Sequence, residues 1–241
     1  RVADVTRRFS WLTGGQAFPP RWSLGFGMTS MAIADAADAD AQIARFVESC
    51  RAHAIPCESF HFGSGYSMHG GRRYAFRWNV EKFPDPAGTI ARLNAAGVRT
   101  VANLKPCLLD DHPRLGELSA SGLVRDAATG APATAQFWDG LGFHLDFTDP
   151  AGRDWWRAGM RDTLLSVGLD TVWNDNNEYE IWDEDAVCAG DGRPFPQSLA
   201  RPAQALLMSK LSRATQMEAR PGLRPYVVTR AGAAGLWRYG Q

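Results

Sequence analysis

The sequence predicts an α/β fold in which parallel strands alternate with amphipathic helices. Short apolar runs are followed by polar loops and then by apolar residues at helical spacing. The chain has 241 residues, 45% of them hydrophobic, which is enough for one sizeable core. Periodicity alone fits both a closed barrel and an open sheet. No phosphate-binding glycine loop follows the first expected strand, because Gly25-Phe-Gly27 continues as Met-Thr-Ser, and this favours the barrel.

Breakers and buried faces mark the elements of the first half. Pro19-Pro20 precedes an apolar run at residues 22–27, which we expect to be a buried strand. Residues 39–53 carry apolar side chains at helical spacing, and residues 55–62 form a second strand whose early proline is tolerated. The segment 63–86 is too long and too aromatic for a plain connection, which favours a functional insertion.

The second half continues the alternation. A helix at residues 87–96 ends at Gly97, as helices commonly do at glycine. Asp149 and Pro150 suit the N-cap and first position of a helix that runs to Val167. The remaining expected elements are strands 98–104, 169–173 and 225–229 and a helix at 198–220. We expect residues 1–241 to form one domain.

The composition excludes several classes of partner. Lys plus Arg and Asp plus Glu each number 26, so no net charge attracts nucleic acid or an anionic membrane. No apolar run approaches the roughly 20 residues that span a bilayer. We expect a cytoplasmic protein, because the cysteines are expected to be free thiols. The charged start at residues 1–8 is not typical of a signal peptide. The lack of an initiator Met leaves room for a removed targeting segment.

The cysteines and histidines do not form a metal-binding pattern. No CxxC or His-x-x-x-His spacing occurs, so we expect neither a metal nor a cofactor. We expect the four cysteines to be buried free thiols, while a Cys50–Cys57 bridge stays open. His61 and His144 lie near expected strand ends, where a lone histidine is usually a hydrogen-bonded structural residue.

The segment Val172-Trp-Asn-Asp-Asn-Asn-Glu-Tyr-Glu180 concentrates acids and amides directly after a strand. In a barrel this is the active face. A carboxylate kept ionised by neighbouring hydrogen-bond donors is suited to attack an anomeric carbon. The nine tryptophans fit a groove that stacks on sugar rings, although most would also fit an ordinary core. By composition alone, an Asx-rich turn at the end of a strand is an equal interpretation.

Residues Trp173-Asn174-Asp175-Asn176-Asn177-Glu178 resemble the Trp-x-Asp-Met-Asn-Glu signature of glycoside hydrolase family 31, with Asn176 in place of the Met. Further matches in family order are Pro19-Pro20-x-Trp22, Phe83-Pro84-Asp85-Pro86, Trp138-x-Gly140, Asp146-Phe147-Thr148 and Thr229-Arg230. The resemblance covers nearly the whole chain. It implies a (β/α)8 or TIM barrel, incomplete in this chain and truncated at both ends relative to the family, with about the first five or six strands.

The resemblance also implies a function and roles for residues. The family's retaining α-glycosidases act on terminal α-linked sugars, and the match makes Asp175 the nucleophile that forms a covalent glycosyl intermediate. Glu178 would be a supporting acid that orients this loop. Arg230 would contact both the sugar hydroxyls and Asp175, and Trp138 would line the sugar subsite with Trp173. The expected partner is a small oligosaccharide or another α-glycoside.

One departure concerns the second catalytic group. The family's acid/base is an Asp in a Trp-x-Gly-Asp segment, which by spacing would fall about five residues past Gln241. Retaining chemistry needs both carboxyl groups, about 5–5.5 Å apart. We therefore expect the 241-residue chain by itself not to turn over its substrate.

The other departure concerns the sugar. The family's α-glucosidases carry Asp-x-Asp-Tyr after the second strand, where an Asp reads the 4-hydroxyl, and this chain has Gly63-Ser64-Gly65-Tyr66. Tyr66 keeps its place and is a candidate substrate contact. Lys105 either holds hydroxyls in place of the lost Asp or forms an ion pair at the barrel rim.

Several functions stay open beside an α-glucosidase-like one. The lost acids are compatible with α-galactosidase-like or α-xylosidase-like specificity. A transglycosylase uses the same covalent intermediate, and a non-catalytic carbohydrate-binding homologue would keep only the groove. The sequence also leaves an oligomer open.

Overall fold

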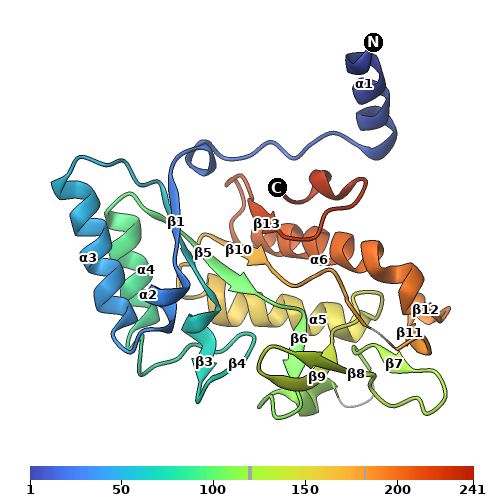
Figure 1. The fold of residues 1–241 in the computed structure, drawn as a ribbon. Coiled ribbons are helices and arrows are strands. Elements are labelled where there is room, and N and C mark those ends of the chain that lie inside the picture. Colours follow the sequence, from blue (N-terminus) through green and yellow to red (C-terminus); the bar gives the residue numbers. More distant parts are fainter. Residues whose placement is uncertain (119–120, 182) are drawn as a thin grey trace.

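In a computed structural model, which describes residues 1–118, 121–181 and 183–241, the chain folds around a sheet of five parallel strands. The strands are β1 (Gly27–Thr29), β2 (Ser59–Phe62), β5 (Arg99–Leu104), β10 (Thr171–Asn174) and β13 (Val227–Thr229). Their order in the sheet, β1-β2-β5-β10-β13, is their order in the chain (Figure 1). Parallel neighbours joined in sequence through helices build a (β/α)8 barrel, so the expected partial barrel is confirmed.

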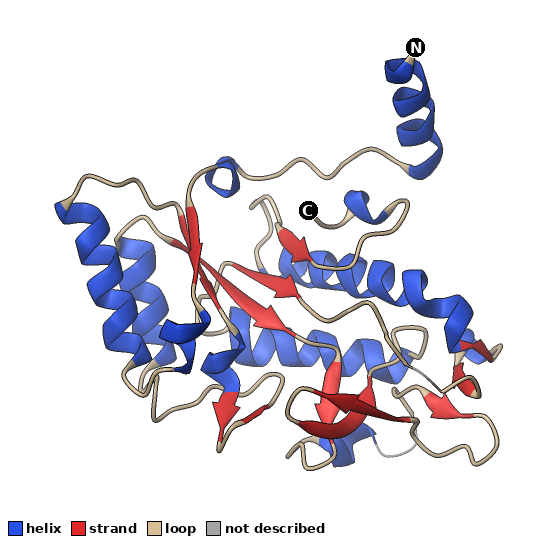
Figure 2. Cartoon of the chain, in the orientation of Figure 1, coloured by secondary structure: helices blue, strands red, loops and turns tan. Residues whose placement is uncertain are grey.

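Helices connect these strands (Figure 2). They are α3 (Ala39–Ala52), α4 (Pro86–Ala95), α5 (Pro150–Gly159) and α6 (Gln197–Ala219). The Asp149 side chain accepts a hydrogen bond from the Ala151 amide at 2.9 Å, which confirms it as the N-cap of α5. The helix expected to run to Val167 is α-helical only to Gly159 and continues as a π-helix over Met160–Leu165.

The expected strand at residues 22–27 is wrong in its first part. Residues Arg21–Leu24 form a 3-10 turn, in which Ser23 Oγ donates to the Pro20 carbonyl at 2.8 Å. The strand begins only at Gly27 and is half-exposed, because β1 is an edge strand of the sheet. Trp22 packs against Tyr226, but Leu24 and Phe26 are exposed, so the expectation that this run is buried is also wrong.

Small antiparallel units, which periodicity did not predict, lie beside the carboxyl ends of the parallel strands. The segment predicted to be a functional insertion contains a hairpin of β3 (Met68–His69) and β4 (Arg72–Arg73). Its turn, Gly70-Gly71, has φ angles of 57° and 82°, which favour glycine at both positions. A three-stranded sheet consists of β6 (Cys107–Leu109), β9 (Gly140–His144) and β8 (Thr134–Phe137). A second comprises β12 (Phe195–Pro196), β11 (Ala186–Cys188) and β7 (Arg125–Asp126).

The core lies between the parallel sheet and its helices. Phe60, Phe62, Leu104 and Val172 are fully buried strand residues. Trp156 of α5 is also fully buried and donates from Nε1 to Ser212 Oγ of α6 at 3.0 Å, which joins the two helices. All four cysteines are free, and two of them, Cys57 and Cys107, are only half-buried rather than fully buried as expected.

The segment after helix α1 (Val2–Thr13) lies against the C-terminal residues, where the Ala17 amide donates to the Trp237 carbonyl at 2.7 Å (Figure 1). Helix α1 has no buried residue and is held through Phe9 against Trp237. Helix α2 (Met31–Asp35) follows β1. Gln241 makes two main-chain hydrogen bonds with β13, from the Thr229 amide and to the Val227 carbonyl, in the pattern of a parallel ladder. In the described ranges, no helix has the length and apolar character to cross a membrane.

Candidate active site

The register of the parallel sheet brings the candidate residues together. Leu104 pairs with Asn174, and Asn174 pairs with Thr229, so the next residue of each strand end lies at the same edge. These next residues are Lys105, Asp175 and Arg230. The Asp175 amide continues the ladder to the Leu104 carbonyl at 2.8 Å. Two basic side chains that are far apart in sequence, Lys105 and Arg230, are thereby placed beside the Asp175 carboxylate.

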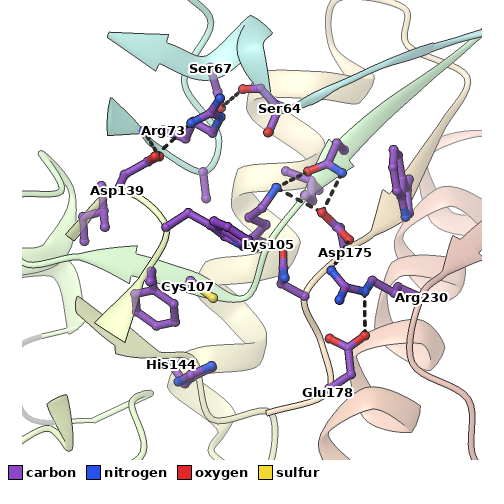
Figure 3. Close-up of a pocket in the computed structure, with 18 of the residues that line it drawn as sticks. Ser64, Ser67, Arg73, Lys105, Cys107, Asp139, His144, Asp175, Glu178 and Arg230 are labelled. Carbon is purple, nitrogen blue, oxygen red and sulfur yellow. Dashed lines mark hydrogen bonds and ion pairs between the residues drawn. The ribbon is translucent and has the colours of Figure 1, made fainter. Parts of the chain in front are cut away.

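Asp175 is buried and surrounded by donors (Figure 3). Its Oδ2 accepts from Asn103 Nδ2 at 3.0 Å and lies 3.0 Å from Lys105 Nζ. Lys105 Nζ also donates to Asn103 Oδ1 at 2.8 Å, which closes a three-residue ring of contacts. Asp175 Oδ1 has a looser partner, Arg230 Nη1 at 3.5 Å.

These contacts determine the charge of Asp175. Burial raises the pKa of this carboxyl, but the Lys105 ammonium and hydrogen bonds from Asn103 and Lys105 lower it by more. The pKa of Asp175 therefore lies below its usual value, and the group is an anion at neutral pH. An anion with one oxygen saturated by donors and the other nearly free is suited to act as a nucleophile.

Glu178 and Asn176 organise the arginine beside this carboxylate. Arg230 Nε donates to Glu178 Oε1 at 2.8 Å. The Asn176 amide, oriented to satisfy both neighbours, donates to Asp175 Oδ2 at 3.1 Å and accepts from Arg230 Nη1 at 2.9 Å. Asn176 has a φ of 49°, a left-handed conformation that asparagine tolerates better than most residues. This conformation turns the backbone directly after Asp175.

The carboxylate faces a cavity of about 670 Å³, a volume within the range of small-molecule sites. Its walls come from the β2 and β5 ends, the β3–β4 hairpin, the β8–β9 turn and the loop after β10. Trp138 on the β8–β9 turn is 85% exposed at the rim, and Trp173 lines the cavity. A rim indole and a charged floor are a suitable arrangement for stacking and orienting a sugar.

Tyr66 and Lys105 line the cavity but already have partners. The Tyr66 ring is fully buried, and its hydroxyl donates to the Asn103 carbonyl at 3.0 Å, which supports the residue that binds Asp175. Lys105 forms the ion pair that was one of its two expected interpretations, with Asp175 as the partner. The roles of Tyr66, Trp138, Trp173 and Lys105 toward a substrate stay predictions.

The two histidines near strand ends differ. His61 Nε2 lies 3.1 Å from Ser59 Oγ, as expected of a hydrogen-bonded residue. His144 also lines the cavity, but its buried Nδ1 has no partner among the described residues, so the expectation of a hydrogen bond is wrong for this nitrogen. Packing holds the ring instead, with ring centres 4.8 Å from Phe137 and 5.1 Å from Tyr179. Within the described parts of the chain, no three His, Cys, Asp or Glu side chains cluster as metal ligands.

The sequence matches the family description "Glycosyl hydrolases family 31 TIM-barrel domain" over residues 16–241. The chain belongs to glycosyl hydrolase family 31. This confirms the family that the Asp175 segment indicated, and its TIM-barrel fold.

Similar proteins are named as an alpha-xylosidase and an alpha-glucosidase. The alpha-xylosidase XylQ of Lactiplantibacillus pentosus is 27% identical over 73% of this chain. Alpha-glucosidase 2 of Bacillus thermoamyloliquefaciens is 25% identical over 98% of it. The chain covers 22% and 30% of these two relatives, so it spans less than a third of their length.

Solved structures of the family show the same fold. The catalytic subunit in the ER glucosidase II complex superposes on 98% of this chain with a TM-score of 0.83 and 22% identity, and the chain covers 26% of it. A Flavobacterium johnsoniae family 31 dextranase complexed with glucose gives 0.80 over 94% of the chain at 22% identity, with 28% of that enzyme covered.

Family resemblance missed several residues of the cavity. Asn103 holds Asp175, and its only sequence signal is a polar residue within an apolar strand. Arg73 and Asp139 also line the cavity and bind each other, although they are 66 positions apart. No local pattern could have paired them, because their contact depends on how two loops meet in the fold.

Proposed function

We propose that the protein containing this chain is a retaining α-glycoside hydrolase, α-glucosidase-like, that acts on terminal α-linked sugars through a glycosyl-Asp175 intermediate. One observation carries the proposal. In a family 31 barrel, Asp175 is a buried anion at the carboxyl end of β10, facing a cavity, with Lys105, Asn103 and Arg230 around it.

The contacts assign a task to each oxygen of Asp175. Oδ2 is held by Lys105 and Asn103, so Oδ1 is the oxygen free to form a bond to the anomeric carbon as the leaving-group oxygen departs. Arg230, fixed by Glu178, lies beside Oδ1, where it can donate to a 2-hydroxyl; such contacts strengthen in the oxocarbenium-like transition state. The proton for the leaving group comes from the acid/base expected in the Trp-x-Gly-Asp segment.

The test is a panel of nitrophenyl α-glycosides, with glucosides, galactosides and xylosides, given to the full-length protein and to its Asp175→Ala variant. We expect the full-length protein to cleave at least one of them, and the variant to lose at least about 10³-fold in kcat/KM. Asp154→Ala is the control, because Asp154 is an exposed acid on α5 outside the cavity. Unchanged activity of Asp175→Ala would overturn the proposal, and a transfer product instead of free sugar would indicate a transglycosylase.

A further inference from the structure

A second charged cluster lies in the same cavity. Arg73 Nη1 donates to Asp139 Oδ1 at 2.8 Å, and the Arg73 main-chain amide donates to Asp139 Oδ2 at 2.9 Å. Both residues line the cavity, and their side chains are mostly buried, at 21% and 12% exposed. Arg73 comes from the β3–β4 hairpin and Asp139 from the β8–β9 turn.

This pair lies on the side of the cavity away from Asp175 (Figure 3). Ser64 and Ser67, which follow β2, line the same side. A sugar with its anomeric carbon at Asp175 directs its remote hydroxyls, those at C4 and C6, toward the opposite wall. Lys105 is poorly placed for this task, since its ammonium already binds Asp175 and Asn103.

A second carboxylate, that of Asp35 at the end of α2, lies beside Arg73. Both oxygens of Asp35 lie 3.4 Å from Arg73 Nη2. A Cβ built on Gly65 would lie 2.3 Å from Asp35 Oδ1 and 2.4 Å from the Ala34 carbonyl oxygen. The space in which a side chain at position 65 would begin is thus occupied by Asp35 and its backbone. Two acids of the family's Asp-x-Asp-Tyr motif are missing after β2, and at the second of these positions, Gly65, Asp35 occupies the space of the side chain.

The charge of the cluster indicates which groups it accepts. One guanidinium faces two carboxylates, so the three side chains together carry a net negative charge. This disfavours an anionic sugar. A carboxylate has about four acceptor sites, and Arg73 occupies two of those on Asp139. The pair therefore offers acceptors and a forked donor side by side, which suits neutral hydroxyl groups.

We propose that the Arg73–Asp139 pair, positioned by Asp35, binds the C4 and C6 hydroxyls of the terminal sugar and sets the sugar specificity of the enzyme. This inference rests on the proposed function, because it places the anomeric carbon at Asp175. The competing interpretation is structural: the pair only fastens the hairpin to the β8–β9 turn. The two interpretations predict different behaviour of variants of the pair. If the pair binds the sugar, the activity lost by a variant depends on whether the substrate carries the C4 or C6 hydroxyl; if the pair is structural, it does not.

The test uses the full-length enzyme, the aryl α-glycoside that it cleaves best, and the 4-deoxy and 6-deoxy analogues of that glycoside where the sugar has these hydroxyls. The wild type should lose at least about 10-fold in kcat/KM on a deoxy analogue, as expected for a hydrogen bond to a charged group. Asp139→Asn should lose about 10- to 100-fold on the parent glycoside but be nearly equal to wild type on that deoxy analogue.

Asp110→Asn is the matched control, because it removes one of the two ion pairs of the neighbouring Arg72, the one at 2.7 Å, outside the cavity. Arg73→Lys is the second variant; it keeps the charge but loses the fork, and should show the same dependence on the deoxy position.

Three results would overturn the inference. In the first, the wild type has the same kcat/KM on the parent glycoside and on the deoxy analogues. This comparison needs only the wild-type enzyme. In the second, Asp139→Asn and Arg73→Lys lose equally on every substrate, which is the structural result. In the third, the wild type cleaves no α-glycoside, in which case the proposed function fails first.

Discussion

A single carboxylate, Asp175, shows how neighbours compensate for burial. Removing an anion from water is costly, and burial alone would raise its pKa toward neutrality. Lys105 and Asn103 reverse that effect through contacts of 3.0 Å each to the same oxygen. Arg230 adds less, because it is half-exposed and lies at 3.5 Å. The side chain that most controls the charge of Asp175 is therefore Lys105.

Replacing Lys105 by Met should move the acid side of the pH profile. Asp175 must be ionised to attack, so activity is lost as the pH falls through its pKa in the folded enzyme. Without the ammonium, burial dominates and this pKa rises, so the acidic limb of kcat/KM moves to higher pH. The measurement is kcat/KM against pH for the full-length enzyme, with Lys210→Met, an exposed lysine on α6, as the control. An acidic limb that does not move would show that Lys105 does not set the charge of the nucleophile.

The contact between α2 and the 3-10 turn Ser64–Ser67 shows how two elements constrain a residue. Gly65 lies in this turn against the Ala34 carbonyl of α2, so close that no Cβ fits without movement. Lys82 strengthens the same contact, since its buried ammonium donates to the Asp35 carbonyl at 2.9 Å. The glycine is therefore required by close packing of backbone, not by its own φ angle.

Gly65→Asp, which restores the second acid of the family's Asp-x-Asp-Tyr motif, should destabilise the protein. The new side chain would meet main-chain atoms that cannot move aside, and overpacking of this kind costs about 1–3 kcal/mol. Urea unfolding measures the change. Gly116→Ala is the matched control, because a Cβ there meets no atom within 4 Å and should change stability little. A variant as stable as wild type would show that α2 moves to make room for the new side chain without loss of stability.

Acid sensitivity is a property of the whole molecule, because burial lowers the pKa of four of its five histidines, which lie in different parts of the fold. The pKa is lowered for His61, His69 and His112, and most of all for His144, for which it falls to about 3. These groups stay neutral in the folded chain at a pH where the unfolded chain already binds protons. The contribution of these histidines to the free energy of unfolding is therefore complete above pH 6.5, the ordinary pKa of histidine. It is lost as the pH falls from there toward the lower pKa of the folded chain.

His144→Phe should reduce this acid sensitivity. For a group that titrates near 6.5 when unfolded and near 3 when folded, the loss of unfolding free energy on going from pH 7 to pH 5 is about 2 kcal/mol. The phenyl ring keeps the contacts with Phe137 and Tyr179 and does not titrate. Urea unfolding at the two pH values measures the difference, with the exposed His53→Phe as the control. An equal pH dependence in His144→Phe and wild type would contradict the prediction.

The sequence by itself determined the local features of this protein. Helix spacing, N-caps such as Asp149 and the segment around Asp175 depend on residues a few positions apart, so the alternation and the family could be predicted. Where a short run with apolar residues is neither buried nor paired with a neighbouring strand, as at residues 21–24, the prediction of a strand was wrong.

Only the tertiary structure decided which side chains meet. Lys105 and Asn103 reach Asp175 because of the strand register, and Asp35 lies against Gly65 because α2 packs on the neighbouring turn. Arg73 finds Asp139 because two loops, 66 positions apart, converge on one cavity. The physical reason is that local sequence determines hydrogen bonds within an element. Contacts between elements depend on sheet register and packing, which the whole chain determines together.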